Sequence, residues 1–305
     1  MKYTIITCSS AFSSIWKYTK EPDIDIKWAF KGSNSKILSF IRMTWFKHNL
    51  PMKKIWIHQD MNNLGSVNIV FDSGANEFLL KWIRDRNPDK RCILYYWNIM
   101  NDNSNLRIEK IRQMGYELWG FDFEDAKKYN YTYNSQFFCP SWYSDLDKSQ
   151  PPSYDISFVG RDKHKRLQTA EKMVADLSSK GFLTSNLYFA APKWYLALKN
   201  RKYKKILKFK EMLNQEISGK VLLDITDNGQ SGYTLRVFDA LCNGRKLVTN
   251  NTHIVHEDFY NKQNIFVYGI DSLEDFKVFL NTPFSFEKAK ELNNRDVAHW
   301  LARFK

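Results

Sequence analysis

The sequence predicts an α/β protein built from two successive domains, each with a parallel sheet. Short β-rich apolar runs alternate with longer segments of helical periodicity along the chain, as strands and crossover helices do in parallel sheets. The chain has 305 residues, and because domains commonly have about 100–200 residues, this length favours two of them. Hydrophobic residues make up 43% and charged residues 26% of the chain, which is the composition of a folded globular protein.

The expected strands fall into two series. The first series lies at residues 3–8, 67–71, 92–97 and 118–121, with a further short strand at 136–139. A loop that contains Pro151 and Pro152 follows, and it is the expected linker. The second series lies at residues 156–159, 187–189, 221–225, 246–249 and 265–268, with helices between the strands, notably at 165–179 and 235–243.

These elements predict a first domain at residues 1–148 and a second at residues 149–285. The remaining residues, 286–305, end in an amphipathic pattern with Val297, Trp300 and Leu301 on one side. Such a stripe at helical spacing predicts a C-terminal helix that packs back on the body.

Cysteine usage and hydropathy favour a cytoplasmic protein. Four cysteines, at positions 8, 92, 139 and 242, lack C-x-x-C spacing and mostly lie in apolar runs, as reduced core thiols do. The apolar run at the start of the sequence is too short for a signal-peptide core. No uncharged apolar run approaches the roughly 18 residues that span a bilayer, so we expect any membrane contact to be peripheral.

The net charge of +13 is concentrated in two segments. Residues 161–220 contain 15 basic and 5 acidic residues, and residues 26–59 contain 7 basic residues and no acidic one. Such patches attract nucleic acid, anionic lipid or phosphorylated substrates, and charge alone does not choose among them. A nucleic-acid-binding protein is therefore an alternative, but the sequence has no helix-turn-helix, zinc or RNP-type signature, and we expect no nucleic-acid partner.

Within the first basic segment, residues 35–56 interleave Lys and Arg with Ile, Leu, Phe and Trp. This pattern is compatible with docking on an anionic membrane. It is equally compatible with an ordinary helix whose apolar face enters the core.

The strongest chemical motif begins at the expected strand 221–225, passes through a Gly-containing polar loop and enters the expected helix 235–243. Free N–H groups and the macrodipole at the start of a helix favour a phosphate group. Arg236 and Asp239 follow within that helix. A carboxylate at the position of Asp239 can accept hydrogen bonds from both hydroxyls of a ribose, and Gly244 then ends the helix.

A second motif lies earlier in the same expected domain. The expected strand 156–159 is followed by Gly160, and the cations Arg161, Lys163, Lys165 and Arg166 come next. Cations beside the first helix of the domain can neutralise a diphosphate leaving group. The alternative is a solvated basic turn.

The run at residues 231–250, SGYTLRVFDALCNGRKLVTN, resembles the C-terminal-domain signature of GT-B glycosyltransferases. That signature has an acidic residue, Gly, an aromatic residue, mostly apolar residues, Glu-Ala, a Gly-containing turn and a strand. The resemblance implies two Rossmann-like domains that face each other across a cleft, with the donor diphosphate on the loop and the nucleoside ribose on the helix carboxylate. By position, the implied donor-binding residues are Gly160, Arg161, Lys163, Gln230, Ser231, Gly232, Tyr233, Thr234, Arg236 and Asp239.

Two departures from the signature concern the reaction stereochemistry. Ser231 stands where many retaining members have their first Glu, and Asp239 replaces the second. The resemblance therefore implies the fold and the donor half, and not a retaining mechanism. The missing Glu pair also keeps open a non-catalytic partner in a polysaccharide assembly complex.

Further runs in the first half, FDSG, YYWN and LWGFDFEDAKKY, extend the resemblance to bacterial capsular and lipopolysaccharide glycosyltransferases. It implies transfer of a sugar from a nucleotide-sugar donor, held by the second domain, to an acceptor on the first. The implied acceptor is a glycan or lipid-linked saccharide of surface polysaccharide synthesis. Because GT-B enzymes generally need no metal, the resemblance implies neither a metal nor a cofactor.

The candidate catalytic residues are Asp72 and Asp122. Each follows an apolar run that is expected to be a strand, and the carboxyl ends of parallel strands are where the sites of such sheets gather. A carboxylate there can take the proton of an acceptor hydroxyl. The alternative for either residue is a cap on the next helix.

Two Asp-x-Asp triplets, Asp23-Ile-Asp25 and Asp145-Leu-Asp147, resemble the metal-binding motif of the other large transferase fold. Neither follows a convincing buried strand. We therefore expect no metal site at these positions.

Overall fold

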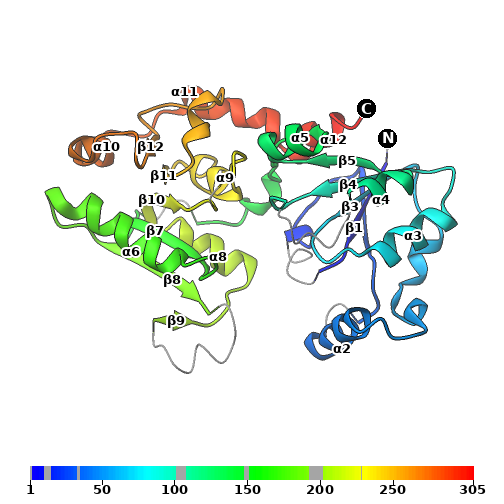
Figure 1. Ribbon diagram of the computed structural model, residues 1–305. Helices are drawn as coiled ribbons and strands as arrows, with labels where there is room; N and C mark the ends of the chain where they lie inside the picture. Colours follow the sequence, from blue (N-terminus) through cyan, green and yellow to red (C-terminus); the bar gives the residue numbers. More distant parts are fainter. Residues whose placement is uncertain are drawn as a thin grey trace. The chain divides into compact units, whose positions relative to one another are not determined.

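The computed structural model describes residues 2–9, 15–32, 35–100, 108–147, 151–191, 202–227 and 229–305. The chain forms two compact units, residues 1–135 and 136–305. Each unit has a six-stranded sheet with helices packed beside it (Figure 1). The expected fold class, two successive parallel α/β domains, is confirmed. The boundary between the units lies earlier in the chain than the Pro-containing loop.

The N-terminal sheet has the strand order β2-β1-β3-β4-β5-β6, and every neighbouring pair is parallel. Its strands are β1 (Tyr3–Thr7), β2 (Ile24–Trp28), β3 (Val67–Phe71), β4 (Arg91–Tyr96), β5 (Glu117–Gly120) and β6 (Thr132–Tyr133). Its helices are α2 (Lys36–Lys47), α3 (Glu77–Arg86), α4 (Ile108–Gln113) and α5 (Phe123–Tyr129).

The central strands of this sheet are buried on both faces, and the edge strands are not. Every residue of β1 and β3 is buried, as in parallel strands that helices cover on both sides. Every residue of β2 is only partly buried. The sequence did not predict β2 because charged residues interrupt its apolar run, which is tolerated at the edge of a sheet.

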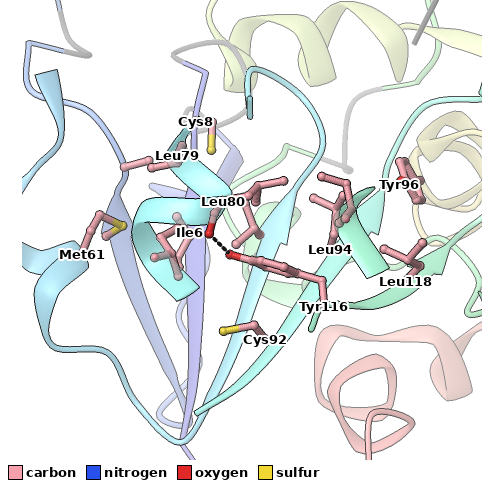
Figure 2. Close-up of a cluster of buried hydrophobic side chains, with 14 of the residues drawn as sticks. Ile6, Cys8, Met61, Leu79, Leu80, Cys92, Leu94, Tyr96, Tyr116 and Leu118 are labelled. Atoms are coloured by element: carbon pink, nitrogen blue, oxygen red, sulfur yellow. Dashed lines mark hydrogen bonds between the residues drawn. The ribbon is translucent and has the colours of Figure 1, made fainter. Parts of the chain in front are cut away.

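One hydrophobic core holds the N-terminal unit together. Figure 2 shows side chains of β1, β4 and β5 meeting those of α3. Tyr116 lies among them, and its hydroxyl donates to the backbone oxygen of Leu80 at 3.0 Å. A buried hydroxyl without a partner would cost about 1–3 kcal/mol, so this bond lets an aromatic ring fill the core. Cys8 and Cys92 are buried thiols, as expected.

The C-terminal sheet has the order β12-β11-β10-β7-β8-β9, again with parallel neighbours throughout. Its strands are β7 (Tyr154–Arg161), β8 (Ser185–Ala190), β9 (Tyr203–Lys204), β10 (Gly219–Asp224), β11 (Lys246–Thr249) and β12 (Ile265–Val267). Its helices are α6 (Arg166–Leu177), α8 (Phe209–Glu216), α9 (Leu235–Leu241), α10 (Phe276–Asn281), α11 (Phe286–Ala289) and α12 (Val297–Ala302).

The end of the chain packs back on this unit, as expected from the sequence. It consists of α11, the 3-10 helix η7 (Lys290–Arg295) and α12 in place of one continuous helix. Val297, Trp300 and Leu301 are all buried. The ring centroid of Trp300 lies 4.3 Å from that of Phe137.

The strand expected at residues 136–139 is wrong. The backbone of Phe138 forms a single bridge to Asp296, and its N–H donates to Arg295 at 3.3 Å. This apolar run is buried because it packs beside the end of the chain, so burial and not strand pairing explains its hydrophobic residues. Within the part of the chain that the structure describes, every helix is too short or too polar to cross a bilayer.

Replacing Phe137 by Ala should destabilise the C-terminal unit by about 3–5 kcal/mol, since a fully buried Phe leaves a large cavity when truncated. Urea unfolding followed by circular dichroism measures this change. The matched control is Phe182→Ala, because Phe182 is 92% exposed and its loss should shift stability by less than about 0.5 kcal/mol. Equal stabilities of the two variants would contradict the packing of residue 137.

Candidate functional site

In each sheet the first strand of the unit has neighbours on both sides. β1 lies between β2 and β3, and β7 lies between β8 and β10. The strands that follow in the chain are therefore added on both sides of the first strand, and the strand order reverses there. In open parallel sheets, ligands bind in the crevice at the carboxyl ends of strands where the order reverses. The carboxyl ends of β7 and β10, and those of β1 and β3, are thus the candidate sites.

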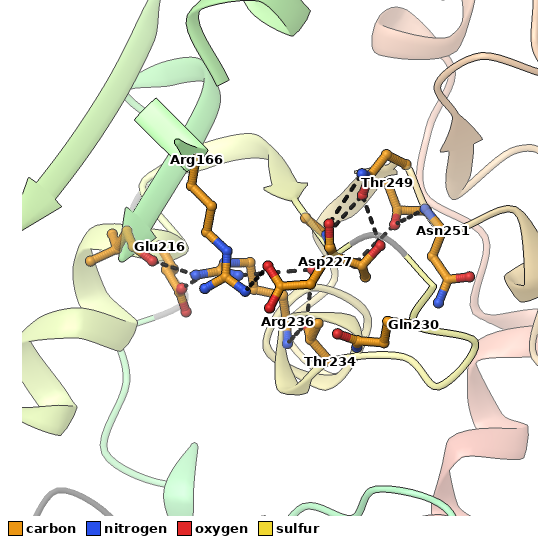
Figure 3. A network of polar contacts seen from close by, with 12 residues as sticks. Arg166, Glu216, Asp227, Gln230, Thr234, Arg236, Thr249 and Asn251 are labelled. Carbon is orange, nitrogen blue, oxygen red and sulfur yellow. Dashed lines mark hydrogen bonds and ion pairs between the residues drawn. The ribbon is translucent and has the colours of Figure 1, made fainter. Parts of the chain in front are cut away.

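A buried carboxylate organises the carboxyl end of β10. Asp224 is fully buried and accepts hydrogen bonds from the hydroxyls of Thr234 and Thr249, each at 2.8 Å. The guanidinium of Arg236 lies 3.8 Å from the same carboxylate. Asp224 therefore ties together the ends of β10 and β11 and the start of α9. Figure 3 shows Thr234 and Thr249 within this network of polar contacts.

Arg236 is fixed between the two strands of the candidate site. Its guanidinium lies over the ring of Phe158, 4.3 Å from the centroid, and donates to the backbone oxygen of Val159. Its Nε lies 3.2 Å from the Glu216 carboxylate. A Cβ atom at Gly160 would lie only 3.3 Å from this guanidinium and 2.9 Å from the Phe158 ring. The glycine therefore makes room for Arg236 at the end of β7.

A second arginine lies at the same end of the sheet. Arg166 donates to Asp227 across 3.2 Å, and the two side chains point toward one another in Figure 3. His164 Nδ1 lies 3.0 Å from the same carboxylate. The two predicted donor-binding cations lie nearby: Arg161 ends β7, and both Arg161 and Lys163 are exposed. Their donor-binding role stays a prediction.

The Gly-containing loop is held by side-chain amides. Asn251 donates to the backbone oxygens of Ser231, at 3.2 Å, and Gly232, at 3.3 Å. Gln230 also donates to Gly232, at 2.7 Å. Thr234 caps α9 by accepting from the backbone N–H two residues later, at 3.1 Å. The predicted loop residues therefore form one ordered turn next to Asp224.

The side chain of Tyr233 faces the interior of the unit. It is 3% exposed, its ring meets Phe259 edge-on, and its hydroxyl accepts from Arg295 Nε at 2.9 Å. Arg295 in turn pairs with Glu257 at 3.0 Å. Tyr233, the aromatic residue of the motif, therefore anchors the loop to the interior of the unit.

Asp239, the predicted ribose ligand, is also buried in this structure. It is 4% exposed, and its carboxylate accepts from the Tyr143 hydroxyl at 2.9 Å. Burial raises the pKa of Asp239 to about 6. Burial and the nearby Asp239 carboxylate raise the pKa of Glu216 well above its usual range. The ribose role of Asp239 stays a prediction, and the structure adds that Tyr143 occupies its carboxylate.

A cavity of about 540 Å³ lies elsewhere in the C-terminal unit. It adjoins the other end of α9, at Leu241 and Cys242, and is also lined by Phe138 and His299. None of the predicted donor-binding residues lines it. Its place therefore differs from the carboxyl end of the sheet.

In the N-terminal unit, Asp72 lies at the candidate site of β1 and β3. Its carboxylate accepts from the backbone N–H of Trp97 at 2.8 Å and from the Asn98 amide at 3.3 Å. Loss of hydration raises the pKa of Asp72 to about 6, although these hydrogen bonds oppose the shift. Gly74 has φ +84°, and a Cβ there would lie 3.0 Å from the Cys8 oxygen. The turn after β3 therefore packs closely against the end of β1.

Asp122 has the geometry of a helix cap. It is 1% exposed, and its carboxylate accepts from the backbone N–H of Asp125 at 3.0 Å, at the start of α5. Its backbone oxygen accepts from the Tyr131 hydroxyl at 3.3 Å. Asp122 thus caps α5, which was the alternative expected from the sequence. Its catalytic role stays a prediction.

Several residues of this arrangement were not expected from the sequence. Asp224, Thr249 and Asn251 position the loop, and Tyr143 and Glu216 surround Asp239. An acidic residue at the end of an apolar strand was a usable signal for Asp224. The others carry no local signal, because their partners lie far away in the sequence.

Neither Asp-x-Asp triplet forms part of a metal-binding cluster in the structure. Across the described ranges, no three His, Cys, Asp or Glu side chains are grouped as metal ligands. Asp25 lies 3.8 Å from Lys27, and Asp145 lies 3.3 Å from Lys210.

Comparison with solved structures places the fold. An α-glucosyltransferase solved with UDP and a 13-mer DNA containing a central A:G mismatch matches 100% of this chain and 98% of its own, with a TM-score of 0.63 and 13% identity. A glycosyltransferase from Rickettsia africae matches 99% of this chain and 97% of its own, with a TM-score of 0.55 and 8% identity. The chain therefore has the GT-B glycosyltransferase fold. No family model and no curated protein sequence matches it.

Asp239→Asn should flatten the dependence of stability on pH. A carboxyl group whose pKa rises from 3.8 to about 6 on folding binds its proton more tightly in the folded state. The wild type should therefore lose stability, on the order of 2–3 kcal/mol, as pH rises from about 4 to about 6. Asp239→Asn removes this loss of stability. It also removes the carboxylate that raises the pKa of Glu216. Thermal unfolding between pH 4 and pH 7 measures the effect.

The matched control is Asp85→Asn, because Asp85 is an exposed helix residue paired with Lys81. Its curve should run parallel to that of the wild type. If the curve of Asp239→Asn were also parallel to that of the wild type, the raised pKa of Asp239 would be contradicted.

Proposed function

We propose that this protein is a glycosyltransferase that moves a sugar from a nucleotide-sugar donor to an acceptor hydroxyl. The observation that carries the proposal is the motif SGYTLRVFDALCNG, whose loop follows the carboxyl end of β10 and leads into α9, in a chain with the GT-B fold. The first of the two matching structures named above was solved with UDP, which supports a nucleotide as the donor's leaving group.

The C-terminal unit would bind the donor. Gly160 makes room for Arg236 at the end of β7, and the exposed cations Arg161 and Lys163 lie at the same end of the sheet. A diphosphate leaving group needs its developing charge neutralised, and fixed cations supply this without a metal. We accordingly propose transfer that continues in the presence of a metal chelator.

The N-terminal unit would supply the acceptor side and the base. In an inverting transfer, the acceptor oxygen bonds to the anomeric carbon while its proton passes to a carboxylate. The bond from that carbon to the diphosphate breaks, and the nucleoside diphosphate leaves with the electron pair. Asp72 suits the role better than Asp122, because it is partly exposed and its pKa is raised to about 6, near the range where a general base is most effective.

For the acceptor we propose a glycan or lipid-linked saccharide of bacterial surface polysaccharide synthesis. The first-half runs FDSG, YYWN and LWGFDFEDAKKY support this class, since they resemble capsular and lipopolysaccharide enzymes. The reaction would take place at the cytoplasmic side, where nucleotide sugars serve as donors.

A second candidate acceptor is DNA. Two observations favour it: the net charge of +13 and the likeness to a glucosyltransferase solved with a DNA duplex. Incubating the protein with labelled donor and either duplex DNA or lipid-linked saccharide separates the two. Label that appears in DNA alone would decide for this candidate.

A thermal-shift screen of UDP-, GDP-, CMP- and dTDP-sugars should identify one donor that stabilises the fold, because a ligand that binds only the folded state raises its melting temperature. Arg161→Gln with Lys163→Gln should then weaken donor binding about tenfold or more, as charge-assisted hydrogen bonds to phosphate are lost. Calorimetry measures the affinity.

The control for this pair is Lys220→Gln. Lys220 is also exposed and lies next to the amino end of β10, paired with Asp155 at 2.8 Å. Its loss should leave donor affinity unchanged. Equal weakening in both variants would point to overall charge and contradict a donor site at the end of β7.

Asp72→Asn should lower turnover by about 10²- to 10⁴-fold, because an amide cannot accept the proton. In the wild type, kcat/KM should rise with pH through an apparent pKa of about 6 as the carboxyl becomes ionised. Asp122→Asn is the matched variant. Since Asn caps helices as well as Asp does, activity should survive if Asp122 only caps α5.

Initial-rate kinetics over pH 5 to 9 test both variants. Loss of activity in Asp122→Asn with full activity in Asp72→Asn would reverse the assignment. Full activity in both would remove both carboxylates from the reaction.

A further inference from the structure

The outward face of α2 is apolar. Ile37, Phe40 and Ile41 follow the i, i+3, i+4 spacing of one helix face and are 72%, 70% and 41% exposed. Met43, on the flank of this stripe, is 67% exposed. Helices on the surface of a globular protein normally turn such a stripe toward the core. Here it faces solvent, and α2 lies at one edge of the N-terminal unit (Figure 1).

Other side chains hold α2 on the unit. Arg42 is buried, and its guanidinium lies 4.4 Å from the centroid of the Phe30 ring. Phe46, one turn later, packs against the hydrophobic core. Because these two residues lie on the inner face, the apolar stripe contributes little to folding. Of the two alternatives left open by the sequence, a helix that turns its whole apolar face to the core is not observed, because Phe46 contacts the core while the apolar stripe is exposed.

The chain that follows α2 also exposes apolar side chains. Trp45 donates through its indole N–H to the backbone oxygen of Pro51 at 2.7 Å, which folds this segment back on the helix. Leu50, Met52 and Ile55 are then exposed as well. The α2 surface consists of Ile37, Phe40, Ile41, Met43, Leu50, Met52 and Ile55.

Charge within the segment that carries the α2 surface is of one sign. Lys31, Lys47 and Lys54 are exposed, and residues 26–59 contain no acidic side chain. Large apolar side chains together with exposed lysines are the composition of helices that lie in the interface of an anionic bilayer. The apolar groups enter the acyl boundary while the lysines meet the lipid phosphates.

We propose that the α2 surface docks this protein on an anionic lipid bilayer. Duplex DNA would match the lysines, but it offers no place for several exposed side chains of this size, since proteins bind its backbone mainly through charged and polar groups. A bilayer matches both. The proposal goes beyond sugar transfer and does not depend on it, because it concerns binding and not turnover.

Sedimentation of the full-length protein with vesicles tests the proposal. Binding to phosphatidylglycerol–phosphatidylcholine vesicles should be strong, and binding to phosphatidylcholine alone should be weaker by about tenfold or more. The triple variant Ile37→Gln, Phe40→Gln, Met43→Gln should lose at least about tenfold in affinity for the anionic vesicles. Lys47→Gln with Lys54→Gln should reduce binding and its dependence on salt.

The matched control replaces three exposed apolar side chains of the C-terminal unit, Phe182→Gln, Val278→Gln and Ile270→Gln, which are 92%, 69% and 56% exposed. Its vesicle binding should equal that of the wild type. Circular dichroism and the donor-induced thermal shift should be unchanged in both triple variants. A normal donor shift together with lost vesicle binding therefore tests docking separately from the proposed transfer.

Three outcomes would overturn the proposal. In the first, the wild-type protein does not bind anionic vesicles. In the second, the two triple variants bind vesicles equally. In the third, the variant Ile37→Gln, Phe40→Gln, Met43→Gln binds vesicles normally but loses either self-association, measured by light scattering, or affinity for duplex DNA. That result would give the α2 surface to a second copy of the chain or to a nucleic acid.

Discussion

The candidate donor site depends on one buried carboxylate. Asp224 has no contact with water, and an unpaired carboxylate in such a place would be strongly unfavourable. The hydroxyls of Thr234 and Thr249 and the nearby Arg236 cation compensate it. Because Asp224 ends β10 and its partners come from the start of α9 and from β11, satisfying this one charge fixes both ends of the Gly-containing loop. The loop conformation therefore follows from an electrostatic requirement in the core.

The parts of the fold that the sequence predicts are those whose burial is uniform. β1, β3 and β11 are buried at every residue, so their continuous apolar runs stand out. The strands that were missed, β2, β6 and β9, are the edge or near-edge members of their sheets. Their pairing is decided by neighbouring strands and not by their own composition. The buried run at 136–139 shows the converse, because burial without a strand partner leaves the same apolar pattern.

The sequence indicated which loops and strand ends form the candidate donor site, but not the directions in which its side chains point. Gly160 and Arg236 meet at the end of β7, as two separate motifs indicated. The directions of Tyr233 and Asp239 depend on Arg295 and Tyr143, and Tyr143 lies 96 residues away from Asp239 in the chain. No local pattern contains such a contact. A motif therefore tells which loop approaches a ligand, while the packing behind it decides which side chains remain available.

The same excess of positive charge has different meanings in the two units, because its surroundings differ. At the end of β7, Arg161 and Lys163 lie beside Arg166 and its partner Asp227, in a polar setting where a compact anion with many oxygens is the fitting ligand. Around α2, the lysines border side chains such as Phe40 that cannot be satisfied by a small anion or by water. A net charge of +13 by itself favours any polyanion. The neighbouring apolar or polar side chains differ between the two clusters, and this difference is the basis for proposing donor binding in one unit and bilayer binding in the other.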